Sequence, residues 1–147
     1  MHTIAAAGAG FLIAVLWFDL MFDVQARGGA VVLPDKVLAS ISAYYRRVTT
    51  EASPMGRLVT LVMLITVAAL VVEIVRGEGP QWAGAISLAA ALIGMGLALA
   101  RTVRNAVRLG AATDPPELRT TLARRILADH LASLAAMSLV LALQIAT

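Results

Sequence analysis

The sequence predicts an all-α membrane protein, a four-transmembrane-helix bundle with an additional cytoplasmic amphipathic helix. Hydrophobic residues make up 60% of the 147 residues and charged residues only 14%, with a mean hydropathy of +0.85. A single water-soluble core of this size does not enclose so much apolar surface. Four stretches of low charge, residues 1–18, 58–72, 79–100 and 126–147, are each about as long as is needed to cross a hydrocarbon core of roughly 30 Å. Eleven of the twelve Lys and Arg residues lie between these stretches, in residues 25–57 and 101–125.

The spans built on these stretches form one membrane domain over residues 1–147, and capping residues and prolines mark the starts of two of them. The spans are expected at residues 3–23, 54–76, 81–108 and 115–146. Ser53 followed by Pro54 predicts an N-cap and an N1 proline at the start of the second span. Asp114, with Glu117 three residues later, predicts a capping box before the fourth.

The placement of Lys and Arg also predicts the orientation. Cytoplasmic loops carry the excess of these residues, so both basic segments are expected inside and both termini outside, which leaves Arg76 alone in the opposite loop. The chain is therefore expected to be a multi-pass protein of the bacterial inner (cytoplasmic) membrane, with membrane lipid as a partner.

Residues 35–50 have the periodicity of an amphipathic helix. One arc is apolar or aromatic and contains Val37, Leu38, Ile41, Tyr44, Tyr45 and Val48. The opposite arc contains Lys36, Ser40, Ser42, Arg46 and Arg47. This pattern predicts a helix in the inner headgroup region, with its tyrosines at the interface and its polar arc in water.

Small residues recur at fourfold spacing in three spans. The three sets are Ala6, Gly10 and Ala14, then Ala90, Gly94 and Ala98, and finally Ala128, Ala132 and Ala136. Because small residues let helices approach closely in lipid, these faces are expected to pack against other helices. They also offer surfaces on which a homo-oligomer would assemble.

Ionisable residues inside spans are costly in lipid, so they are the candidate functional residues. Eight polar residues are expected to meet at the inner ends of three spans as a ligand-binding cluster: Asp19, Asp23, Arg101, Arg104, Asn105, Arg125, Asp129 and His130. Arg57, at the start of the second span, is placed to close the ring.

Two interpretations of this cluster are open. In the structural one, the charges neutralise one another, and Asp19 or Asp23 pairs with Arg101 or Arg104 at matching depth. In the functional one, the excess of arginine over aspartate leaves positive charge for the carboxylate or phosphate of a ligand.

His130 and Asp129 are the candidate catalytic residues, because imidazole changes its charge near neutral pH and is a common general acid or base. Helix neighbours point about 100° apart, so adjacency in sequence does not make them a pair. A structural hydrogen bond is the alternative for His130. Glu73 is expected to pair with Arg76, three residues later on the same helix.

Several chemistries are disfavoured. The chain has no cysteine, which excludes disulfides, thiolate nucleophiles and Cys-ligated metal centres. No P-loop, dinucleotide fingerprint, HExxH or GxSxG motif occurs. His2 and His130 are expected on opposite sides of the membrane, which disfavours bis-histidine haem ligation. We expect neither a metal nor a cofactor. The net charge of +3 follows from the topology rule, and we expect no nucleic-acid partner.

Three features together resemble the anthrone-oxygenase-like family of small four-span membrane proteins from bacteria and fungi. They are the small-residue first span, the segment Tyr44-Tyr45-Arg46-Arg47 before a proline and the second span, and the Arg-containing entry to a last apolar span. The resemblance implies a cofactor-free oxygenase activity in some members of the family. It assigns no catalytic residue to this chain.

The leading hypothesis for function is an inner-membrane four-helix protein that binds a small amphipathic or anionic ligand at the cytoplasmic polar cluster. A small-solute transporter or channel component is the second hypothesis, and it requires an oligomer because four spans are few for one path. A membrane-embedded, cofactor-free oxygenase-like enzyme is the third. A non-catalytic assembly partner is the fourth.

The orientation is testable with reporter fusions. Fusions at Met1, Gly79 and Thr147 are expected to report the outside, and fusions at Tyr45 and Thr113 the cytoplasm, because of the eleven-to-one partition of basic residues. An outside location of Tyr45 would contradict the predicted orientation.

Overall fold

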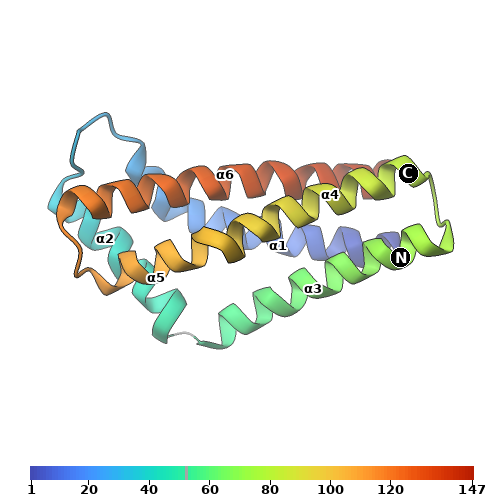
Figure 1. Cartoon of the computed structure of the whole chain (residues 1–147), viewed down its shortest axis with the longest axis horizontal. Helices are drawn as coiled ribbons and strands as arrows, with labels where there is room; N and C mark the ends of the chain where they lie inside the picture. The colour runs from blue at the N-terminus through green and yellow to red at the C-terminus, as the bar shows by residue number, and fades with distance from the viewer. Residues whose placement is uncertain (52) are drawn as a thin grey trace.

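The computed structural model describes the backbone of residues 1–51 and 53–147, and it describes the side chains of these residues except that of Ser53. The N-cap predicted at Ser53 therefore lies outside the described residues. Within the described part of the chain every regular element is a helix (Figure 1), as predicted for an all-α protein.

Four helices are long and apolar enough to cross a membrane. The first is α1 (His2–Asp23), which ends in a short 3₁₀ turn, η1 (Val24–Arg27). The second is α3 (Ser53–Arg76) and the last is α6 (Pro116–Ala146). The third is continuous but contains a π-helical turn: α4 (Gln81–Leu97), then η3 (Ala98–Thr102), then α5 (Val103–Ala111).

The long helices run side by side, with both termini at one end, the terminal end, and α2 (Asp35–Arg46) at the other, the α2 end (Figure 1). Helix α6 packs against α1 and α4, and α3 packs against the same two helices from another side. Within the described residues the backbone of α3 does not come close to α5 or α6, although Gln144 of α6 donates a side-chain hydrogen bond to Glu73 near the terminal end of α3. The bundle is therefore open on the side of α3 towards the α2 end.

Helix α2 continues into a second π-helical turn, η2 (Arg47–Glu51), and packs mainly on α5. Its apolar residues Leu38, Ile41 and Tyr45 are buried in a core shared with α5 and α6. Ser42 was expected to face water, but it is buried and accepts a 2.8 Å hydrogen bond from Arg119. Protein therefore covers much of the apolar arc of this helix and part of the arc that was expected to face water.

The predicted small-residue faces are only partly correct. Ala90 and Gly94 are buried in the contact of α4 with α6. Ala14, Ala128 and Ala132, however, are exposed. The close approach of α1 occurs instead at its neighbouring face, where a Cβ on Gly8 would lie 2.0 Å from Thr66 Oγ1 of α3. The fourfold spacing of small residues therefore identified helices that pack closely, but on α1 and α6 most of the packing occurs on another face.

Two predicted local contacts are wrong. Glu73 does not pair with Arg76, because it points into the bundle, where Gln144 donates a 3.2 Å hydrogen bond to it. Arg76 lies instead 3.7 Å from Glu78. Asp114 makes no cap, and α6 starts without a side-chain cap. The Asp114 carboxylate accepts hydrogen bonds from Arg108 at the end of α5.

Gly110 is required by the contact of α2 with α5. A Cβ at this position would lie 2.7 Å from the backbone nitrogen of Arg46, whereas a Cβ on Gly96, earlier in the same span, would meet no atom within 4 Å. Gly110→Ala is expected to lower the free energy of unfolding by about 1–3 kcal/mol, because backbone atoms have to move. Gly96→Ala is expected to leave it unchanged or raise it by up to about 1 kcal/mol, through helix propensity.

Thermal unfolding of the purified variants in detergent, followed by circular dichroism, measures both effects. Equal stabilities of the two variants would contradict the proposed close contact.

Candidate functional site

The eight polar residues predicted as one cluster divide between two sites at the α2 end. Asp19 and His130 line a cavity inside the bundle. Arg101, Arg104, Asn105, Arg125 and Asp129 line a separate groove on its surface. Asp23 lies behind the cavity wall, where it contacts His130. No described residue lines both the cavity and the groove.

The cavity has a volume of about 360 Å³ and lies where α3 diverges from the other helices. Most of its wall is apolar, and four of the six methionines of the chain contribute to it: Met55, Met63, Met95 and Met137. Methionine is flexible and polarisable, so walls rich in it adapt to apolar ligands of different shapes. Residues of both π-helical turns, including Thr49 and Thr102, also line the cavity. Such turns are frequent at functional sites.

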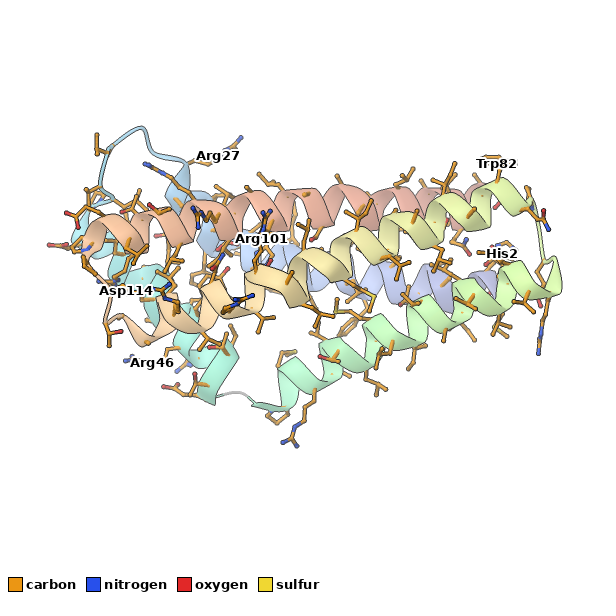
Figure 2. All side chains as sticks on the ribbon, in the orientation of Figure 1. His2, Arg27, Arg46, Trp82, Arg101 and Asp114 are labelled. Carbon is orange, nitrogen blue, oxygen red and sulfur yellow. The ribbon has the colours of Figure 1, made fainter. Side chains whose placement is uncertain are left out.

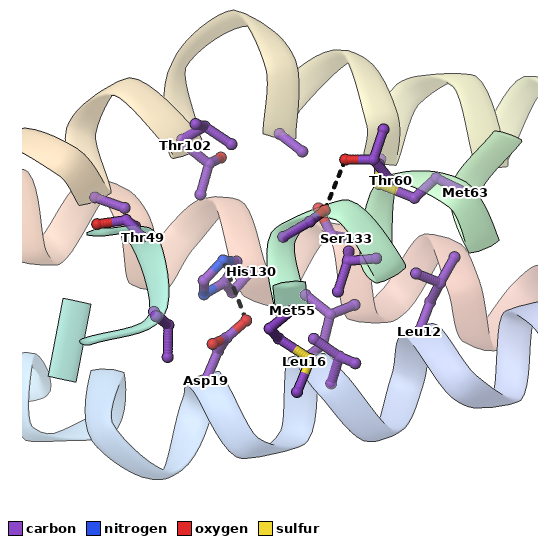
Figure 3. Close-up of a pocket in the computed structure, with 18 of the residues that line it drawn as sticks. Leu12, Leu16, Asp19, Thr49, Met55, Thr60, Met63, Thr102, His130 and Ser133 are labelled. Carbon is purple, nitrogen blue, oxygen red and sulfur yellow. Dashed lines mark hydrogen bonds and ion pairs between the residues drawn. The ribbon is translucent and has the colours of Figure 1, made fainter. Parts of the chain in front are cut away.

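One end of the cavity is polar. Figure 3 shows His130 of α6 and Asp19 of α1 facing each other there, with Thr49, Thr102 and Ser133 nearby. His130 Nε2 lies 3.9 Å from Asp19 Oδ2, which is too far for a direct hydrogen bond. His130 Nδ1 lies 2.6 Å from Oδ2 of Asp23, a residue that is 0% exposed. Asp23 thus orients the imidazole and directs Nε2 towards the cavity.

Two tyrosines of α2 complete the hydrogen bonding of the aspartates. Tyr44 donates its hydroxyl to Asp19 over 2.5 Å, and Tyr45 donates to Asp23 over 2.6 Å. Burial, followed by the charge of Asp19, raises the pKa of Tyr44 above its usual value. Burial and the charge of Asp23 likewise raise the pKa of Tyr45. Both phenols therefore stay protonated at neutral pH and act as donors to the carboxylates.

Asp129 faces the other side of α6. It is buried, and Arg101 binds it with both Nε and Nη2. Thr102 donates a further hydrogen bond to the same carboxylate over 3.1 Å. Asp129 and His130 are therefore not a pair. The carboxylates within reach of His130 are those of α1.

The predicted pairing of Asp19 or Asp23 with Arg101 or Arg104 is wrong. Asp19 and Asp23 are satisfied by tyrosines and His130, and Arg101 is held by Asp129. Matching depth was a correct criterion, but it did not reveal which side of each helix the residues occupy. Arg57 is exposed and lines neither the cavity nor the groove, so it does not close a ring.

The groove lies between α5 and α6 and has a volume of about 500 Å³ (Figure 2 labels Arg101). Besides the five predicted residues, Arg108 and Ala128 line it. Two other arginines of α6 have structural roles instead, because Arg119 and Arg124 donate to backbone carbonyls of residues 38 and 28. The groove and the cavity therefore present different chemistry, cationic in one and amphipathic in the other.

The sequence missed several residues of the cavity. Tyr44 and Tyr45 were recognised but placed at the membrane interface, and Thr102, Ser133 and the methionines carried no distinguishing spacing. The described residues contain no group of three or more His, Asp or Glu side chains placed to hold a metal ion. No family model, curated protein or solved structure matches the chain.

The corrected pairing is testable by a double-mutant cycle on Arg101→Gln and Asp129→Asn. Arg101→Gln leaves the buried Asp129 carboxylate without its cation, and Asp129→Asn leaves Arg101 without its carboxylate. The two losses in unfolding free energy are therefore expected to couple by about 1 kcal/mol or more. The cycle of Arg101→Gln with Asp19→Asn is the control, and additivity within about 0.5 kcal/mol is expected. Thermal unfolding in detergent measures both, and equal coupling in the two cycles would contradict the pairing.

Proposed function

We propose that this chain is a four-span protein of the bacterial inner membrane that binds a small amphipathic molecule in the cavity at the α2 end. The observation that carries this proposal is the division of one cavity into an apolar body and a polar end with Asp19 and His130. Ligand sites typically have this composition, a mostly apolar wall with a few polar groups that orient the ligand. The volume of about 360 Å³ falls in the range of such sites.

Membrane insertion is supported by the exposed surface of the long helices. Large apolar side chains point outward along all four, among them Phe18, Leu64, Ile93 and Leu139. Water-soluble monomers rarely expose so many, whereas lipid-facing helices do. The basic residues at the α2 end favour its location on the cytoplasmic side.

The open side of the bundle supports access to the cavity from the lipid. Leu99 and Val103 line the cavity and are also well exposed at its margin. A molecule dissolved in the bilayer would enter between α3 and α5 with its apolar body among the methionines. Its polar head would then reach His130 and Asp19.

A proton-transfer enzyme is the second candidate function, and the contact between Asp23 and His130 favours it. In this arrangement a buried carboxylate holds Nδ1 of a histidine and Nε2 is open to a ligand site. The histidine can then act as a general base, and the carboxylate orients it. A bound hydroxyl, as in a phenol, would donate its proton to Nε2. Asp19 would stabilise the resulting imidazolium.

Binding is testable with naphthol, a fluorescent phenol with an apolar ring system, and the chain reconstituted in lipid nanodiscs. Leu99→Trp is expected to weaken saturable binding about tenfold or more, because the larger side chain fills the cavity margin. Leu92→Trp is the matched control, since Leu92 is exposed on the same span but does not line the cavity. Unchanged binding to Leu99→Trp would contradict the proposed site.

His130→Gln separates the two candidate functions. It is expected to abolish any conversion of bound naphthol to naphtholate, which absorbance reports, while methoxynaphthalene, which has no acidic proton, still binds. Loss of both ligands together would assign His130 to the shape of the cavity, and naphtholate formation without His130 would exclude it as the base.

A further inference from the structure

We infer that the arginine groove, the surface site lined by Arg101, Arg104, Asn105, Arg108, Arg125 and Asp129, binds the phosphate headgroup of an anionic phospholipid. This site shares no described lining residue with the cavity. The inference rests on the membrane insertion proposed above, but it is independent of any ligand in the cavity.

The charge of the groove is the first argument. Four arginines and one aspartate line it, so its lining carries a net charge of +3. Asp114, which pairs with Arg108 at the rim, reduces the net charge of groove and rim to +2. Arg104 and Arg125 have no carboxylate within ion-pair distance in the described part of the chain. This surface therefore attracts anions.

The groove is also organised before any ligand binds. Asp129 is buried and holds Arg101 through Nε and Nη2, which leaves Nη1 without a protein partner among the described residues. Asp114 holds Nε and Nη2 of Arg108 in the same way. Fixed guanidinium groups lose less rotational freedom on binding, and their planar donors match the oxygens of a phosphate.

The position of the groove favours a lipid over a soluble anion. It lies at the α2 end of helices that also expose large apolar side chains, including Ile93 on α4 and Leu139 on α6. A phospholipid whose phosphate occupied the groove would have its acyl chains beside these residues. Basic pockets at the cytoplasmic ends of spans recognise anionic headgroups in this way.

Native mass spectrometry of the full chain in detergent tests this inference. Phosphatidylglycerol and phosphatidylcholine with identical acyl chains are titrated against the protein, and preferential binding of phosphatidylglycerol is expected. Arg104→Gln with Arg125→Gln is expected to weaken that binding about 30-fold, from the contribution of two arginines near an anionic headgroup. Both residues are exposed, so the fold does not depend on burying them.

Arg47→Gln with Arg57→Gln is the matched control, because it removes the same charge from two exposed arginines outside the groove. This control is expected to change binding of phosphatidylglycerol less than threefold. Equal binding of the two lipids, or equal losses in the two double variants, would overturn the inference.

Inorganic phosphate and the water-soluble glycerophosphoglycerol form the last arm of the experiment. Weak binding of both, compared with the intact lipid, is expected. If either competes as well as phosphatidylglycerol, the groove is a site for a free anion and the lipid assignment is wrong. Liposome flotation of the same preparations reports membrane insertion separately, so a failure of the proposed insertion is distinguished from a failure of the groove.

Discussion

The hydrogen bonding of the buried Asp23 carboxylate organises the α2 end of the molecule. A carboxylate with no solvent exposure is costly unless several donors satisfy it, and Asp23 receives them from Tyr45 of α2 and His130 of α6. One side chain of α1 thus links three helices. The same contacts direct the imidazole of His130 towards the cavity, so the groups that stabilise the fold also prepare the site.

The cavity exists because α3 does not follow the rest of the bundle. It packs on α1 and α4, whereas within the described chain its backbone does not come close to α5 or α6, and a side-chain hydrogen bond from Gln144 to Glu73 links it to α6 near the terminal end. The π-helical turns η2 and η3 lie at this divergence and turn Thr49 and Thr102 towards the space. A closely packed four-helix bundle would fill this space with side chains, whereas here a wall rich in methionine surrounds it.

The arginines of the chain differ in what they bind, although they look alike in the sequence. Arg119 and Arg124 donate to the backbone carbonyls of residues 38 and 28, which lie between α1 and α3, and Arg101 is held by Asp129. Arg104 and Arg125 have no acidic partner among the described residues. Cavity and groove lie at the same end of the bundle on different sides, and this places an amphipathic site and a cationic site at one level of the molecule.

The all-helical fold and its four long apolar helices followed from the sequence alone. Hydropathy, length and the clustering of charge are properties of contiguous segments, so they can be recognised without knowing how distant segments pack. The same reasoning recognised that Asp19, Asp23, Asp129 and His130 belong near one end. Depth along a helix depends only on position in the sequence, so this part of the site was accessible without the structure.

Which side of each helix faces which partner was decided only by the tertiary structure. Rotation of helices about their axes depends on packing between segments distant in sequence, as in the contact of Gly8 with Thr66. For this reason the sequence analysis assigned Asp129 and His130 to one cluster, and it did not predict the hydrogen bonds of Tyr44 and Tyr45 to the aspartates. It also did not predict the hydrogen bond between Glu73 and Gln144 across the bundle. The cavity depends on all of these rotations together, because it is the space that the packed helices leave open.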